Sequence, residues 1–232
     1  MTTREPDEVT AFFSQWSIYR SIIESNSMEH VEIYRALHDR LARRTQSFTV
    51  LDLGCGDAEG IRPALQGTAA ARYIGVDRAT RALEYAAVVL ADLDAEVELR
   101  EADLLDAVTT SEETFDVIVA AFALHHFGSD DKRRFLAAAR RRLRPGGELA
   151  LIDVVRREGQ SRAEYLDSYE VYVDGWSIPD EAKPEVIAHV RGHDYPEEVA
   201  TLHRWAHEAG FTVVEQWYAG GAGTQAAWSK LV

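Results

Sequence analysis

The hydrophobic positions of the first 45 residues recur at helical spacing. An amphipathic helix is predicted from about Glu8, because its apolar residues follow one another at intervals of three and four. These residues are Phe12, Trp16, Tyr19 and Ile23. A second helix is predicted after Met28, and its apolar residues are Val31, Tyr34, Leu37 and Leu41.

From residue 48 the pattern changes to short apolar runs that alternate with helical stretches. Strands are predicted over residues 48–53, 72–76, 97–99, 115–121 and 148–153. Helices are predicted between them over residues 80–90 and 130–143. Strands that alternate with helices predict an α/β fold of the doubly wound type, with a mostly parallel sheet covered on both faces.

Beyond residue 153 the pattern is helical over 161–176, 180–190 and 197–209, and strands return at 211–218 and 225–231. A short glycine-rich segment joins these last strands, which predicts a hairpin. We therefore expect a seven-stranded sheet with one antiparallel strand.

We expect one domain in four parts. They are an N-terminal helical lid (1–45), a ligand-binding core (46–153), a helical cap inserted after the fifth strand (154–196), and a last helix with a strand pair (197–232).

Composition and charge exclude several functions. The formal net charge of −14 disfavours a nucleic-acid partner, because such partners are polyanions. The basic stretch from Lys132 to Arg144 is interpreted as a solvated helix face rather than a nucleic-acid patch. Cys55 is the single cysteine, so a cysteine-only metal site is excluded and no metal is expected. No apolar run is long enough to span a membrane, and residues 1–8 lack the apolar core of a signal peptide, so a cytoplasmic location is expected.

A glycine loop follows the first predicted strand, and an acid follows the second. Gly54 and Gly56 let the backbone turn sharply and let a ligand approach. Asp77 stands 21 residues after Gly56, a spacing that suits an acid bonding a ribose. A dinucleotide fingerprint needs a third glycine at position 59, where this chain has Glu59, and Gly60 comes one residue late. A carboxylate there opposes a pyrophosphate but suits a ligand that carries a positive charge and no phosphate.

The segment from Val50 to Gly56 resembles the first motif of the class I S-adenosylmethionine-dependent methyltransferases. Four further segments resemble later motifs of the family in the same order: Gly75-Val76-Asp77, Glu101-Ala102-Asp103-Leu104, Phe115-Asp116-Val117-Ile118 and Leu143-Arg144-Pro145-Gly146-Gly147. The resemblance covers residues 48–153, and more loosely the chain from Ala209 onward. One departure is Ala58, where many family members have glycine.

The resemblance implies S-adenosylmethionine as cofactor and S-adenosylhomocysteine as product. It implies that Asp77 takes the ribose, that Asp103 bonds the adenine amino group, and that Asp52 lies near the cofactor's ammonium. The expected cofactor-binding residues are Tyr19, Asp52, Gly54, Cys55, Gly56, Asp77, Arg78, Asp103, Leu104 and Ala121. Tyr19, with Asn26 and His30, is expected to fold over the cofactor from the N-terminal helices.

The methyl acceptor is expected to be a small molecule, handled by a monomer or homodimer. The Asn- or Asp-Pro-Pro-aromatic motif of base-amine methylases is missing after the fourth strand, and a pyrimidine C5 methylase would need a cysteine nucleophile outside the cofactor loop. A protein side chain or RNA as acceptor, and a cofactor-binding protein without catalysis, stay open as alternatives.

Three histidines are candidate general bases, because an imidazole titrates near neutral pH. They are His125 and His126, just after the fourth strand, and His193, at the end of the cap. Plain packing at a strand-to-helix turn is the competing interpretation. Tyr165, Tyr169 and Tyr172 share one helix face near Trp176, which predicts either a cage for a cationic acceptor or simple packing.

Overall fold

The computed structural model describes residues 17–221 and 225–231. Its single sheet has the strand order β3-β2-β1-β4-β5-β8-β7, and the short β6 pairs with β5. The strands are β1 (Phe48–Leu53), β2 (Ala70–Asp77), β3 (Glu96–Glu101), β4 (Phe115–Ala121), β5 (Leu143–Arg156), β6 (Glu197–Glu198), β7 (Val213–Ala219) and β8 (Gln225–Leu231).

The sheet confirms the predicted direction of its strands. β1 to β5 pair in parallel, and β8 runs antiparallel to both β5 and β7. The strand order reverses between β1 and β4, which is where ligands bind in open sheets of this kind.

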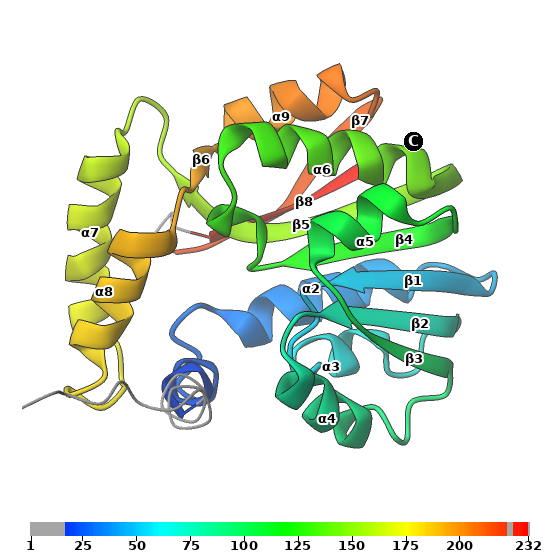
Figure 1. Cartoon of the computed structure of the whole chain (residues 1–232), viewed down its shortest axis with the longest axis horizontal. Helices are drawn as coiled ribbons and strands as arrows, with labels where there is room; N and C mark the ends of the chain where they lie inside the picture. Colours follow the sequence, from blue (N-terminus) through cyan, green and yellow to red (C-terminus); the bar gives the residue numbers. More distant parts are fainter. Residues whose placement is uncertain (1–16, 222–224, 232) are drawn as a thin grey trace, which may run out of the picture.

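Helices cover both faces of the sheet (Figure 1). They are α2 (His30–Leu41), α3 (Ile61–Leu65), α4 (Thr80–Val89), α5 (Leu104–Thr110), α6 (Ser129–Arg142), α7 (Arg162–Asp174), α8 (Lys183–His193) and α9 (Val199–Glu208), preceded by helical residues 17–24. One hydrophobic core joins α5, α6 and α9 to the sheet, and a second joins α2, α3 and α4 to its other face. Alternate strand residues supply the two cores: Leu51 lies in the first and Val50 in the second.

The cap forms a third hydrophobic cluster of its own. It joins α7 and α8 to Ile18 and Ile22 of the helix over residues 17–24. Figure 1 shows these elements side by side, beyond the end of the sheet from which β5 leads into α7. Because parallel strands end at one edge, the cap lies over the carboxyl ends of the strands, as predicted.

Several details differ from the sequence-based expectations. α3 and α5 were not predicted, because five and seven residues are too short to show helical periodicity. Val31 was placed on the apolar face of α2 but is 64% exposed, and Ile33 occupies the buried face instead. Glu197 and Glu198, predicted as helix, form β6 because their backbone pairs with the end of β5. The predicted start near Glu8, with Phe12 and Trp16, lies outside the described residues.

Candidate active site

The glycine loop lies at the point where the strand order reverses. Gly54 and Gly56 both have left-handed backbones, with φ of 80° and 54°. A Cβ on Gly54 would lie 3.1 Å from the Cβ of Ala123, which follows β4. The loop is therefore a turn that only glycine fills easily, and it faces the segment after β4.

A cavity of about 260 Å³ opens beside this loop. It is lined by residues that follow β1 to β4, namely Gly54, Asp77, Arg78, Ala102, Asp103, Leu104, Phe122, Ala123, His126 and Phe127. Five of the predicted cofactor residues thus meet in one cavity, although they come from three different strand ends.

The two predicted adenosine-binding acids are held by backbone amides. Asp77 accepts hydrogen bonds from the N–H groups of Gly56 and Ala79, each at 2.9 Å. Asp103 caps α5, and its Oδ1 accepts from Leu105 at 2.9 Å and from Asp106 at 3.2 Å. Both cap bonds use Oδ1 of Asp103. The amides fix the carboxylates in place before a ligand arrives.

Asp52 is buried at the end of β1 and lies next to the loop. The hydroxyl of Tyr73 donates to its Oδ2 at 2.8 Å. The pKa of Asp52 is raised to about 7, mainly by burial. The hydrogen bond from Tyr73 opposes this rise, and the negative charge of Asp77 adds to it. A cationic group placed nearby would favour the ionised form of Asp52. Burial also raises the pKa of the Cys55 thiol, so Cys55 is a poor nucleophile.

Ala58 adopts a backbone conformation that favours glycine. Its φ is 62°, in the left-handed region, and it is buried. Gly60 also has a packing role. A Cβ there would lie 2.3 Å from the ring of Tyr34 on α2, so the glycine is needed for α2 to pack against the loop.

Tyr19 lies near the glycine loop but lines a different cavity, together with Tyr34, Glu59 and Gly60. Its ring is partly exposed, but burial of the hydroxyl and the nearby negative charges of Asp57 and Asp77 raise its pKa. His30 is buried with its ring 4.8 Å from that of Phe122, and burial lowers its pKa to about 4. Asn26 instead accepts from the N–H of Val31 at 2.9 Å and supports the start of α2.

Ala121 ends β4, and the backbone changes direction directly after it. Phe122 has a φ of 51°, which is rare for an aromatic residue. Its N–H donates to Ile152 of β5 at 2.8 Å, which holds the turn. Strain of this kind is concentrated at functional sites. No sequence signal indicated that Phe122 and Ala123 would line the cavity, because their positions depend on this turn.

His125 is buried and paired with an acid that the sequence analysis did not select. Its Nδ1 lies 2.5 Å from Oδ1 of Asp153, a residue of β5 that is 2% exposed. Burial alone would lower the pKa of His125, but the charge and the hydrogen bond of Asp153 outweigh burial and raise it. The position of Asp153 close to the carboxyl end of a buried strand was a usable sequence signal.

His126 and His193 have different positions. His126 lines the cofactor cavity, and its ring centroid lies 3.9 Å from that of His125. The ring of His193 is exposed, and its backbone carbonyl lies 3.4 Å from Nδ1 of His126. The structure thus brings two of the three predicted histidines together beside the cavity, with Asp194 at the end of the cap next to both.

The aromatic residues of the cap pack mainly against one another. Tyr165, Tyr169 and Trp176 are buried, and Tyr169 and Trp176 meet edge to face with centroids 5.9 Å apart. Tyr172 donates its hydroxyl to the carbonyl of Ser27 at 2.7 Å, which ties the cap to the N-terminal segment. Packing is therefore the main role of this stripe.

Residues 50–147 match the family model described as a methyltransferase domain. Residues 50–147 therefore form a methyltransferase domain, and the strand order of the sheet is that of the class I fold. The match covers the strands and loops that build the cavity described above. No curated protein matches the chain in sequence.

Solved structures share the fold of this methyltransferase. The apo form of the S-adenosylmethionine-dependent methyltransferase SibL has a TM-score of 0.58 and 20% identity, over 98% of this chain and 78% of that one. The N-methyltransferase NodS from Bradyrhizobium japonicum has a TM-score of 0.57 and 16% identity, over 90% and 96%. An O-methyltransferase family protein from Burkholderia thailandensis has a TM-score of 0.64 and 15% identity, over 96% and 70%.

Proposed function

We propose that this methyltransferase acts on a small molecule, bound between the cofactor cavity, the histidine pair and the cap. The observation that carries the proposal is the shared cluster of the cap and the N-terminal helix. Ile18 and Ile22 pack against α7 and α8, so the N-terminal helix and the cap together cover the strand ends. A cover of this kind favours an acceptor that can be enclosed.

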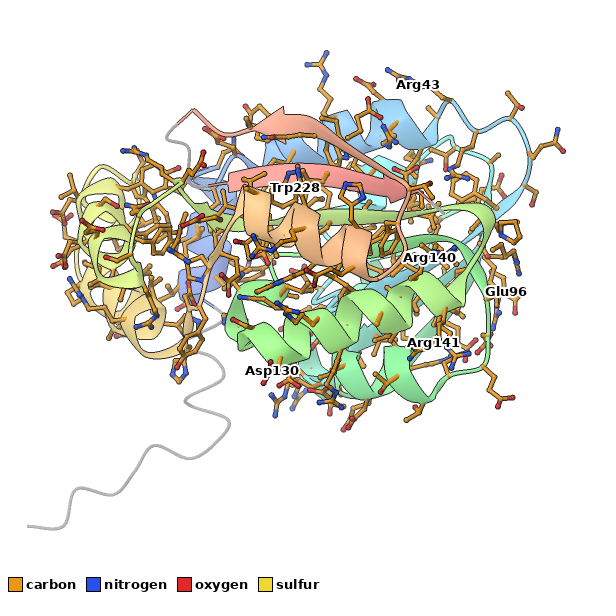
Figure 2. All side chains as sticks on the ribbon, turned by 90° about the horizontal axis from the view of Figure 1, so that it is seen from above. Arg43, Glu96, Asp130, Arg140, Arg141 and Trp228 are labelled. Carbon is orange, nitrogen blue, oxygen red and sulfur yellow. The ribbon has the colours of Figure 1, made fainter. Side chains whose placement is uncertain are left out.

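The distribution of basic residues supports this choice. α6 begins near the strand ends that carry the site and runs away from them, so Arg140 and Arg141 lie at its far end (Figure 2). Arg133 pairs with Glu208 at 3.1 Å, and Arg144 pairs with Asp116 at 2.6 Å. Within residues 17–221 and 225–231, no helix is both long and apolar enough to traverse a bilayer.

The residues of the chain have separate tasks in the proposed reaction. When bound, S-adenosylmethionine supplies a methyl group on a positively charged sulfur. Asp77 and Asp103 hold its adenosine part, and the carboxylate of Asp52 attracts its ammonium group. His126 lines the same cavity, where it would take the proton that the acceptor atom loses on methylation.

The proposal covers both nitrogen and oxygen as the atom that accepts the methyl group. The neighbouring structures include proteins titled as N-methyltransferases and as O-methyltransferases. A hydroxyl or an amine are both compatible with a histidine as proton acceptor.

A screen for S-adenosylhomocysteine release tests the proposal. The protein is incubated with S-adenosylmethionine and, separately, with a metabolite fraction below a few kilodaltons, a protein fraction and an RNA fraction. We expect product release with the metabolite fraction and none with Asp77→Ala. Release with only the protein or the RNA fraction would contradict the proposal.

A further inference from the structure

Three imidazole nitrogens gather around one buried carboxylate oxygen at the edge of the cofactor cavity. Oδ1 of Asp194 lies 3.4 Å from Nδ1 of His126, 3.8 Å from Nε2 of His125 and 4.0 Å from Nε2 of His189. One ligand atom from each of His125, His126 and Asp194 lies within 4.8 Å of the others. These residues come from the turn after β4 and from the end of the cap.

The carboxylate of Asp194 lacks a partner suited to its burial. Its side chain is 6% exposed, and within the part of the chain that the structure describes its Oδ1 accepts no hydrogen bond. The nearby Lys132 donates instead to the carbonyl of Tyr195 and lies 3.6 Å from Glu197. A buried carboxylate needs a compensating positive charge. Three imidazoles face this one within 4.0 Å, and Tyr165 and Tyr169 lie close enough to interact with its charge.

A second buried acid stands behind His125. Asp153 bonds Nδ1 of His125, which leaves Nε2 of the same ring directed toward Asp194. A carboxylate that fixes one ring nitrogen while the other faces a ligand cluster is the arrangement found behind metal-binding histidines. It orients the ring and makes Nε2 a better electron donor.

We propose that His125, His126, His189 and Asp194 bind a divalent transition-metal ion, with Zn²⁺ as the representative ion. Imidazole nitrogens with one carboxylate oxygen suit this class of ion. Ligand atoms around tetrahedral zinc are about 3.3 Å apart, given bonds of about 2.0 Å. The contacts of 3.4–4.0 Å to Asp194 would have to shorten by several tenths of an ångström.

Two adjustments accompany binding. Nδ1 of His126 would exchange its 3.4 Å contact with the carbonyl of His193 for the ion. His189 is 55% exposed in its side chain and lies on α8, so it can move toward the ion without disturbing the core. The sequence predicted no metal, because the ligands are spread over 70 residues in no recognised spacing.

The site would lie beside the methyl acceptor, a placement that rests on the proposed function. His126 lines the cofactor cavity and contributes to the cluster at the same time. An ion there would lower the pKa of a coordinated hydroxyl or amine, whose proton would pass to water, and His126 would act as the proton acceptor only in the metal-free enzyme.

Metal binding is tested on the full chain, without turnover. The protein is stripped with a chelator, dialysed and titrated with Zn²⁺ in competition with a coloured chelator. Co²⁺ is used in parallel, because its visible absorption reports the number and kind of ligands. We expect one ion per chain, and Asp194→Asn and His189→Gln each to weaken binding at least roughly tenfold, with Asp153→Asn weakening it roughly 10- to 100-fold.

His38→Gln is the matched control, because His38 is a half-buried histidine on α2, away from the cluster. It should bind Zn²⁺ as the unaltered chain does. Thermal unfolding without metal shows whether each variant folds, and the exposed His189 is the safest substitution in this respect. Equal affinity in Asp194→Asn, His189→Gln and the control would overturn the proposal, as would the absence of a stoichiometric site.

Calorimetry with S-adenosylmethionine on the same samples separates this inference from the proposed function. Cofactor binding together with small-molecule methylation, but no zinc site, overturns the metal proposal alone. A zinc site with turnover on only protein or RNA overturns the proposed acceptor and leaves the metal site standing.

Discussion

The expected cofactor half of the site and the proposed acceptor half are built in different ways. The cofactor half consists of loops at the ends of β1 to β4, and backbone amides hold Asp77 and Asp103. The acceptor half joins His125 and Asp153 of the core to Asp194 of the cap, and side chains hold it together. The cap in turn packs against the helix over residues 17–24.

The difference shows which half each substitution should affect. Amide-held acids depend on the local turn, so changes there should alter cofactor affinity. Side-chain clusters depend on the docking of the cap, so changes there should alter turnover while the cofactor still binds. The following predictions test this division, starting with the largest expected effect.

His126→Gln should lower kcat by roughly 100- to 10,000-fold, which is the usual contribution of a positioned proton acceptor. The affinity for S-adenosylmethionine, measured by calorimetry, should change by less than about threefold, since His126 is one of ten residues that line the cavity. His38→Gln is the control. If kcat and cofactor affinity fell equally, His126 would belong to both halves of the site and the proposed division would be wrong at this residue.

Asp77→Ala should weaken S-adenosylmethionine binding about 100-fold, since hydrogen bonds to a charged group contribute about 1.5–3 kcal/mol each. The loop also loses the bond from Gly56 to this carboxylate. The matched control is Asp92→Ala, because Asp92 is an exposed acid that bonds Arg62 outside the cavity. Calorimetry gives both affinities, and equal values would refute the ribose assignment.

Gly60→Ala should lower the free energy of unfolding by about 1–3 kcal/mol, the usual cost of overpacking. The added Cβ would lie 2.3 Å from the ring of Tyr34 and push α2 from the cofactor loop. Chemical denaturation measures the change. Gly192→Ala is the control, because a Cβ there meets nothing within 4 Å. A stable Gly60→Ala variant would show that the loop and α2 are not closely coupled.

S-adenosylmethionine affinity should fall about tenfold between pH 8 and pH 6. The pKa of Asp52 is raised to about 7, mainly by burial, so the carboxylate that attracts the ammonium is neutralised below that pH. Asp52→Asn should flatten the profile. In the unaltered chain, the pKa of Asp52 in the folded state lies above the unfolded value of about 3.9. A protonated Asp52 therefore stabilises the fold at low pH, and this stabilisation is lost as pH rises through 7. A profile that stays equally steep in the variant would assign the titration to another group.

Much of the cofactor half could be predicted from the sequence, because its residues are set by local rules. Gly54 is required by a left-handed turn next to Ala123, Asp77 ends the apolar run of β2, and Asp103 follows β3, a partly exposed strand with a weaker pattern. Parallel strands end at one edge, so residues that follow them meet in space. The roles of Gly60 and Phe122 were not predictable, because they depend on contacts with α2 and β5.

The sequence by itself determined the order of the longer strands and helices, and the glycine loop with Asp77 beyond it. Each of these depends on spacing within some 25 residues, which the backbone converts directly into geometry. The motifs that resemble the methyltransferase family, spread over residues 50–147, indicated Asp103 and the type of cofactor. Only the tertiary structure placed His126, and not His193, in the lining of the cavity, paired His125 with Asp153, and brought Asp194 to both His125 and His126. Those choices depend on how the cap docks over the strand ends. Docking follows from the packing of side chains far apart in the chain, and no local pattern encodes it.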